Sequence, residues 1–298
     1  MTSANTRVGV LPDFLVIGAM KAGTTSLYHY LEAHPSVFMP PVKELDFFVE
    51  RGNWGRGIDW YRRQFEGAEG FAAIGEASTA YSKHPIVPGV PERVSMHMPG
   101  CRLVYVVRDP VERIASHYRH RWANGSERAP IDDAVLRDPV YLACSRYAEQ
   151  VRRYLDHFPR EQLLVLTAED LRHDRAATVG ATYRFLGVEP GFRPAALDEE
   201  HYRAESRATY PPAVWRLRKA LKRHVPAAKR AKEMIDSTMP ALVRRWAPSR
   251  TGAGATPRRE PAATISDELR GRLTEMLRDD VARLRPYLRE NWNGWGIA

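Results

Sequence analysis

A glycine-containing loop near the start of the chain carries residue types that bind phosphate. The stretch Gly18-Ala-Met-Lys-Ala-Gly-Thr-Thr-Ser26 directly follows a short apolar run and directly precedes a helical pattern. Between a strand and a helix, such a loop points backbone N–H groups inward, and the helix N-terminus adds partial positive charge. We therefore predict a phosphate-binding loop. The alternative is an ordinary glycine turn with a solvated lysine.

The position of the lysine in this loop separates two chemistries. In the ATP-binding pattern GxxxxGK[ST], the lysine contacts the β and γ phosphates and the next hydroxyl binds Mg²⁺. Here Thr24 occupies that position and the lysine, Lys21, stands three places earlier. A lysine within the loop can meet a bridging oxygen and favours transfer of a sulfuryl group, which is less charged than a phosphoryl group. A metal-dependent kinase, with Asp109 or Asp170 as the metal ligand, is the competing prediction.

A second motif, Val106-Val-Arg-Asp-Pro-Val-Glu-Arg-Ile-Ala-Ser-His-Tyr118, follows another apolar run. Asp109 suits an N-cap, Pro110 suits the first helical position, and Glu112 completes an Asp-x-x-Glu capping box. The pattern predicts that Arg108 lies where a strand ends and a helix begins, with Ser116 about two turns into that helix. Arg108 is then available to bind an anion, or to form a structural salt bridge.

The two motifs together resemble the sulfotransferases that use 3′-phosphoadenosine 5′-phosphosulfate (PAPS). The loop from Lys21 to Ser26 is similar to their 5′-phosphosulfate site, and the second motif is similar to their 3′-phosphate site. Two further stretches, Lys43-Glu-Leu-Asp-Phe-Phe48 and Gly57-Ile-Asp-Trp-Tyr61, are similar to the heparan-sulfate and bacterial branch. The resemblance runs from about residue 14 to 190 and resumes in the final helix.

This resemblance implies a donor site, a product and a set of roles. PAPS would be the donor substrate, 3′-phosphoadenosine 5′-phosphate (PAP) the product, and no metal would be needed. Glu44 would act as the base that takes the acceptor's proton, and Lys21 would stabilise the leaving oxygen. The residues implied to bind the donor are Lys21, Ala22, Gly23, Thr24, Thr25, Ser26, Arg108 and Ser116.

Three residues are candidates for binding the acceptor: Lys43, Asp46 and Glu76. Lys43 could orient Glu44 or the donor, although a Lys-Glu pair is also ordinary surface chemistry. The heparan-sulfate branch often has histidine where this chain has Asp46, proline at Leu45, and lysine at Ala77. The missing cation argues against a polyanionic glycan in the same pose. Glu76 is expected to follow a strand and line the cleft, with a capping or salt-bridge role as the alternative.

The elements that must position these residues alternate along the chain. Short β-branched apolar runs at 14–17, 72–74, 102–107 and 163–166 are separated by stretches with helical spacing, the last of which ends at Gly187. This alternation predicts an α/β fold, with a P-loop-like parallel sheet flanked by helices.

The last third of the chain departs from this alternation. Residues 200–260 contain prolines and basic helical turns and are expected to form a helical basic lid or insertion. A single amphipathic C-terminal helix within 265–298, capped by Ser266 and with apolar positions as far as Leu288, is expected to pack on the 14–190 core. We therefore predict one sulfotransferase domain over residues 1–298.

Charge and composition limit the remaining possibilities. The net charge of +9 is concentrated in 215–259, where thirteen basic residues face two acidic ones, so nucleic-acid binding by the whole fold is not expected. The segment 215–259 could instead dock an anionic or amphipathic acceptor or touch a membrane surface.

The composition predicts a cytoplasmic protein, because the chain has two cysteines, a 44% hydrophobic content and no long apolar stretch. The excess of arginine over lysine is typical of a GC-rich bacterium.

The sequence thus favours transfer of a sulfuryl group from PAPS to a hydroxyl of a small molecule, glycan or glycolipid. The alternatives are the metal-dependent kinase and a nucleotide-binding or membrane-surface module without catalysis. Neither the acceptor nor the oligomeric state follows from the sequence, because specificity resides in loops that the motifs do not constrain.

Overall fold

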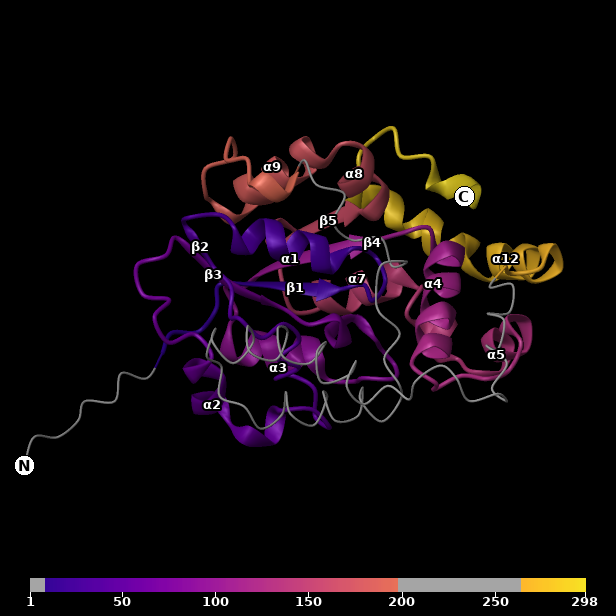
Figure 1. Ribbon diagram of the computed structural model, residues 1–298, viewed down its shortest axis with the longest axis horizontal. Coiled ribbons are helices and arrows are strands. Elements are labelled where there is room, and N and C mark those ends of the chain that lie inside the picture. Colours follow the sequence, from indigo (N-terminus) through magenta and orange to yellow (C-terminus); the bar gives the residue numbers. More distant parts are fainter. Residues whose placement is uncertain (1–8, 198–263) are drawn as a thin grey trace, which may run out of the picture.

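A computed structural model describes residues 9–197 and 264–298 of the chain. The predicted basic lid at 200–260, including the proposed docking segment 215–259, lies outside the described residues. Figure 1 shows a central sheet with helices packed around it.

The sheet confirms the predicted α/β fold. Five parallel strands lie in the order β2-β3-β1-β4-β5. Strands β1 and β4 are almost entirely buried, which agrees with continuous apolar runs in a parallel sheet covered on both faces. The strands are β1 (Phe14–Gly18), β2 (Val37–Phe38), β3 (Ala73–Ala77), β4 (Arg102–Val107) and β5 (Leu163–Thr167).

Helices cover the sheet on both sides, with α1 and α9 on one side and α3 on the other (Figure 1). Tyr183 of α9 donates a hydrogen bond to the carbonyl of Tyr30 in α1 at 2.7 Å, which joins the two helices of the first layer. The helices are α1 (Thr24–Glu32), α2 (Ile58–Arg63), α3 (Val90–His97), α4 (Pro110–Ala123), α5 (Ile131–Arg137), α6 (Val140–Ala143), α7 (Tyr147–Leu155), α8 (Ala168–His173), α9 (Arg175–Leu186) and α12 (Asp267–Leu284).

Several helix ends lie where the sequence predicts them. Asp109 caps α4, since its carboxylate accepts the N–H groups of Val111 and Glu112 at 2.8 and 3.0 Å. Helix α9 ends at Gly187, whose φ of 77° is the left-handed conformation that favours glycine.

The predicted capping box at α4 is wrong in its second half. The N–H of Asp109 donates to Glu169 of α8 at 3.1 Å, not to Glu112. The carboxylate of Glu112 instead accepts from Arg270 of α12 at 3.1 Å. A partner distant in sequence has therefore replaced the local contact that the pattern suggested.

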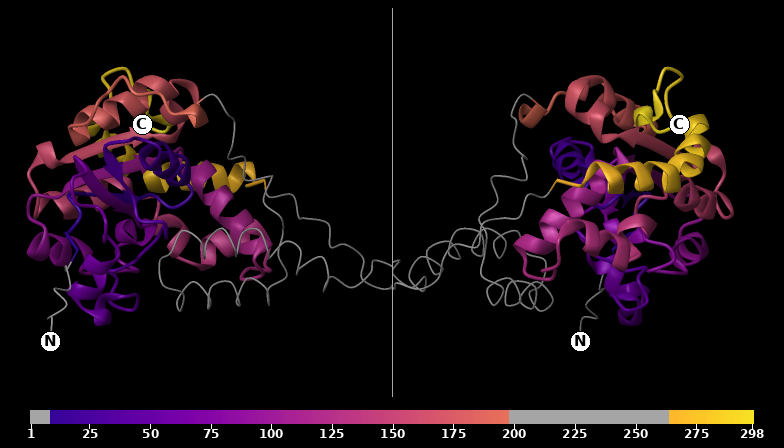
Figure 2. Two further views of the ribbon diagram at one scale, coloured as in Figure 1. Left: turned by 60° about the vertical axis from the view of Figure 1, so that its left-hand side comes forward. Right: turned by 90° about the vertical axis from the view of Figure 1, so that its right-hand side faces the viewer.

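The C-terminal helix α12 packs against α7 and α4 (Figure 2). The hydroxyl of Ser266 accepts the N–H of Leu269 at 3.1 Å, so the predicted N-cap is confirmed. The helix ends at Leu284, so Leu288 lies beyond it, contrary to the expected extent. Leucines and a valine of α12 belong to the same core as the sheet: Leu269, Leu273, Leu277, Val281 and Leu284.

A buried carboxylate connects α12 to the rest of the fold. Asp280 accepts the N–H groups of Ala148 and Glu149, both at 3.0 Å, in the first turn of α7. These amides have no partner within their own helix, so an acidic side chain from α12 performs the role of a cap. The contact fixes the axial position of α12 against α7.

Candidate active site

The order of the strands fixes where a ligand can bind. Strand β1 lies between β3 and β4, and the chain leaves it toward β2 and β3 before it crosses to β4. The crevice beyond the carboxyl ends of strands at such a switch point is the usual ligand site in open α/β sheets. The loop with Lys21 follows β1, Arg108 follows β4, and the Glu44 segment is tied to the end of β3. The structure thus brings the predicted donor and acceptor residues to one edge of the sheet.

The loop after β1 has the form of an anion-binding turn. Its first residue, Ala19, donates to the carbonyl of Val106 in β4 at 2.6 Å, which fixes the loop beside the second motif. Gly23, with φ of 96°, is the N-cap of α1, and no side chain caps this turn within the described part of the chain. In the first turn, the N–H of Ser26 donates to the carbonyl of Gly23 at 3.0 Å. The N–H groups of Thr24 and Thr25 have no acceptor within the helix, so they can receive an anion.

The remaining residues of the loop differ in burial. Ala22 and Thr24 are buried, Thr25 and Ser26 are half-buried, and Gly23 is exposed. Among residues 9–197 and 264–298, a Cβ added at Gly23 would meet one atom within 4 Å, on Leu171 at 4.0 Å, so these residues leave room beside the turn. Lys21 is half-buried and has a positive φ of 72°. An exposed turn beside a lysine fits the shape and charge that a phosphate group requires.

Arg108 joins the two motifs. Its guanidinium donates to the carbonyl of Lys21 at 3.4 Å, and it lies 4.0 Å from the carboxylate of Glu112. Burial lowers the pKa of Arg108, whereas the carboxylates of Glu112 and Glu169 favour its charged form. Arg172 of α8 is close enough to act on this pKa as a second cation. The sequence reasoning did not single out Arg172, because no local motif surrounds it.

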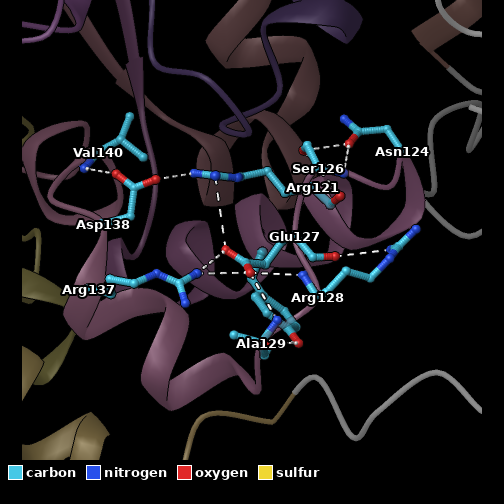
Figure 3. A network of polar contacts seen from close by, with 10 residues as sticks. Arg121, Asn124, Ser126, Glu127, Arg128, Ala129, Arg137, Asp138 and Val140 are labelled. Atoms are coloured by element: carbon cyan, nitrogen blue, oxygen red, sulfur yellow. Dashed lines mark hydrogen bonds and ion pairs between the residues drawn. The ribbon is translucent and has the colours of Figure 1, made fainter.

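Ser116 is buried on α4, two turns after Arg108. Asp109 fixes the start of this helix, and a polar network centred on Glu127 fixes the segment beyond its end (Figure 3). The Glu127 carboxylate accepts the N–H groups of Arg128 and Ala129 at 2.8 and 3.0 Å. It also accepts the Arg137 guanidinium at 3.0 Å. The helix that carries Ser116 is therefore held at both ends.

The charge on Glu127 stabilises that network. Burial alone would raise the pKa of Glu127, but the hydrogen bonds from Ala129, Arg128 and Arg137 outweigh it and hold the pKa below its usual range. Arg121, on the last turn of α4, pairs with Asp138 at 2.5 Å and extends the network toward α6. The contacts are structural and lie apart from the loop after β1.

Glu44 and Lys43 lie on a loop beside the end of β3. The N–H of Glu44 donates to the carbonyl of Ala77 at 2.9 Å, and Glu44 has φ of 64°. Its side chain is 49% exposed and accepts from the Lys43 ammonium at 3.1 Å. An exposed carboxylate on a fixed backbone can approach a bound acceptor, which a general base must do.

Asp46 and Glu76 differ in how deeply they are buried. Asp46 is half-buried, with φ of 48°, and its N–H donates to the Ser78 hydroxyl at 3.0 Å. Glu76 lies inside β3 and is only 1% exposed, so the expectation that it follows a strand is wrong. Its carboxylate accepts hydrogen bonds from three hydroxyl groups, those of Tyr61, Ser78 and Tyr81. Sequence reasoning named Glu76 and missed its partners, although Ser78 and Tyr81 follow it closely in the chain.

The two aspartates of the kinase alternative have structural partners. Asp109 caps α4, and Asp170 contacts Thr167 at 2.6 Å and Arg289 at 2.8 Å. Within residues 9–197 and 264–298, no group of three or more histidine, cysteine or acidic side chains is arranged to hold a metal ion. In the same residues, no helix is both long enough and apolar enough to cross a bilayer.

A comparison with protein families matches the sulfotransferase domain over residues 11–206. Among curated proteins, the chain is 31% identical over 208 residues to human bifunctional heparan sulfate N-deacetylase/N-sulfotransferase 3, covering 61% of this chain and 23% of that protein. It is 35% identical over 127 residues to the membrane-associated sulfotransferase kil1 of Dictyostelium discoideum, covering 41% of this chain and 26% of that protein. The chain thus spans about a quarter of the length of these relatives.

Among solved structures, the fold is similar to a sulfotransferase from Alicyclobacillus acidocaldarius, with a TM-score of 0.67 and 26% identity. The similarity covers 96% of this chain and 99% of that one. It therefore extends over the whole length of a solved member, in contrast to the partial coverage of the curated relatives.

Proposed function

Because the chain belongs to the sulfotransferase family, we propose that it transfers a sulfuryl group from PAPS to a hydroxyl of a small molecule, glycan or glycolipid. The observation that carries this proposal is the contact of Arg108 with the Lys21 carbonyl at 3.4 Å. It places a cation of the second phosphate motif against the backbone of the first. An exposed helix-start turn and a half-buried guanidinium, side by side, fit a donor that has phosphate groups at two positions.

The donor site uses both motifs. The first-turn amides of α1, with Thr24, Thr25 and Ser26, would hold the 5′-phosphosulfate, and Arg108 and Ser116 would hold the 3′-phosphate. The Lys21 ammonium would contact the oxygen that links sulfur to phosphorus. Negative charge builds on this oxygen as the bond breaks, so the contact becomes stronger in the transition state.

The acceptor side uses Glu44. The acceptor oxygen forms a new bond to sulfur as the old sulfur–oxygen bond breaks, and its proton passes to the Glu44 carboxylate. Lys43, at 3.1 Å from that carboxylate, would orient it. Asp46 would contribute to acceptor binding from the same loop.

A second candidate acceptor is an amine. The human relative is named an N-sulfotransferase, and an attacking amine must also lose a proton to a base. Ala77 supplies no cation at the end of β3, which disfavours a polyanionic glycan in the pose of the heparan-sulfate branch. We therefore rank small or weakly charged acceptors above heparan-like polymers.

The donor can be tested directly. We expect purified protein to release PAP from PAPS when candidate hydroxyl or amine acceptors are present, and EDTA should leave this release unchanged. ATP should give no ADP under the same conditions. ADP formation that EDTA abolishes would support the kinase alternative instead.

We expect Arg108→Ala to remove the preference for PAPS over the analogue that lacks the 3′-phosphate. The guanidinium makes charge-assisted hydrogen bonds only when this phosphate is present, so the change should weaken one donor and spare the other. The ratio of kcat/KM for the two donors measures this preference. An equal loss with both donors would assign Arg108 a folding role.

The location of the protein stays a proposal. The Dictyostelium relative is named membrane-associated, which supports peripheral membrane contact. The basic composition of 215–259 makes this segment our candidate for that contact. The cytoplasmic location and the bacterial source stay predictions from composition.

A further inference from the structure

The reaction described above gives no role to Glu76, a carboxylate buried inside β3. One of its oxygens accepts from Tyr81 at 2.5 Å and from Tyr61 at 3.2 Å, and the other accepts from Ser78 at 2.7 Å. A buried carboxylate is costly unless it is well hydrogen-bonded. Three hydroxyl donors surround this one, so its hydrogen bonds offset part of the cost of burial.

Two of the three hydroxyl groups also accept hydrogen bonds from the loop that carries Glu44. Ser78 accepts the N–H of Asp46 at 3.0 Å, and Tyr81 accepts the N–H of Phe47 at 3.0 Å. A hydroxyl has one proton and can also accept. Because each proton is directed at Glu76, the lone pairs face the loop amides. The carboxylate thus orients both acceptors that hold the loop.

The loop needs such support. Glu44 and Asp46 have φ of 64° and 48°, in the left-handed region that side chains other than glycine rarely adopt. Residues in this region persist only where surrounding contacts fix them. The contacts that fix the loop include the Ser78 and Tyr81 hydroxyls and the Ala77 carbonyl, which lie on or just after β3. The side-chain amide of Asn53 also donates to the Leu45 carbonyl at 2.6 Å.

We propose that Glu76 is a positioning residue, which acts through Ser78 and Tyr81 to hold the Glu44 loop in its active conformation. The inference rests on the proposed function of Glu44 as the base. Glu76 itself touches neither donor nor acceptor. Its ionised form is required, because a protonated carboxyl would donate to one of these hydroxyls, whose own proton would then turn toward the loop amide that it now accepts.

The surroundings of Glu76 make its charge sensitive to pH. Burial raises the pKa of Glu76 to about 7, against the hydrogen bonds from Tyr81 and Ser78, which favour the charged form; the charge of Asp46 raises it further. The titratable groups around this carboxyl come from the loop, α2, η2 (Thr79–Ser82), the turn before β4 and α7: Asp46, Tyr61, Tyr81, Cys101 and Tyr154.

Activity and stability should therefore change in opposite directions with pH. A carboxyl whose native pKa lies above its ordinary value of 4.5 adds stability that is complete below that value and is lost as pH rises through about 7. Loop positioning, in contrast, improves as the carboxyl ionises. If Glu76 had a structural role alone, activity would not rise with pH while stability falls.

Three variants test the proposal: Glu76→Gln, Tyr81→Phe and Tyr61→Phe. We expect the first two to lower kcat about tenfold or more, since a small displacement of a catalytic group is costly, with PAP affinity unchanged. Tyr61→Phe is the matched control. It removes a buried phenol hydroxyl from the same carboxylate oxygen, but this hydroxyl has no contact with the loop amides among the described interactions. Its kcat should stay within about twofold of wild type.

Two further measurements accompany these variants. Wild-type kcat should fall as pH drops through about 7, and this limb should be absent from Glu76→Gln. Hydrogen exchange at the amides of Asp46 and Phe47 should accelerate in Glu76→Gln and Tyr81→Phe but not in Tyr61→Phe.

The exchange measurement needs no turnover, so it separates the two hypotheses. If the wild-type protein does not use PAPS, the proposed function is wrong. The exchange rates of Asp46 and Phe47 would still show whether Glu76 holds the loop. Unchanged exchange in Glu76→Gln, or an equal loss of kcat in Tyr61→Phe and Tyr81→Phe, would overturn the positioning role.

Discussion

Replacement of Lys21 by alanine is expected to lower kcat on the order of 10²-fold or more, the usual effect of losing one donor that stabilises developing charge. Binding of PAP should weaken far less. The proposed contact strengthens only as charge builds on the leaving oxygen, so its loss affects the transition state more than the bound product. Measuring kcat by PAP release and Kd by calorimetry gives both quantities on one preparation.

The structure makes this variant suitable for the test. Arg108 contacts the backbone carbonyl of Lys21 rather than its side chain, so alanine keeps the connection between the two motifs. Arg278→Ala is a suitable control, because it removes an exposed cation whose partner is Glu275 on the surface of α12. It should leave kcat unchanged. A tenfold weaker PAP affinity with unchanged kcat in Lys21→Ala would show that Lys21 serves binding alone.

The fold was predictable where local pattern and burial agree. The runs that became β1 and β4 are continuous apolar segments because the sheet is covered on both faces. Caps at Asp109 and Ser266, and the stop at Gly187, depend on residues within four positions of each other. Such contacts are encoded locally, so a single sequence reveals them.

Features that depend on distant partners could not be predicted in the same way. Strand β2 has only two residues, too few for any periodicity, and it is defined by pairing with β3. Glu112 follows a capping-box pattern but binds Arg270, 158 positions later. The apolar spacing also overstates the length of α12, because Leu288 continues that spacing after the helix has ended at Leu284.

In the candidate site, too, local features were predictable and features that depend on distant contacts were not. The donor motifs are contiguous in sequence, so the residues around Lys21 and Arg108 could be named. The backbone conformations of Glu44 and Asp46 could not, because a positive φ at a residue other than glycine leaves no compositional sign. The sequence pattern predicts Glu76 after its strand, because a carboxylate interrupts the apolar run. In the structure Glu76 lies within the strand, because three hydroxyl groups donate to it.

Replacement of Glu44 by glutamine is the second large effect we expect. The amide keeps the shape of the side chain and can still accept from Lys43, but it cannot take the acceptor's proton. Loss of general-base catalysis typically costs about 10²- to 10⁴-fold in rate, so most turnover should disappear. PAP affinity should be unchanged, because Glu44 lies on the loop beside β3 and not on the donor loop. Steady-state kcat and a PAP titration measure the two effects.

Glu50→Gln supplies the matched control, since it removes the charge of an exposed glutamate six residues along the same segment. This variant should keep wild-type kcat. Substantial activity in Glu44→Gln would assign the base to another carboxylate nearby, and the structure ranks the two that remain. Asp46 is half-buried on the same loop, whereas Glu76 is 1% exposed and surrounded by hydroxyl donors. A proton from a bound acceptor can reach the first far more readily than the second, so Asp46→Asn would be the next variant to measure.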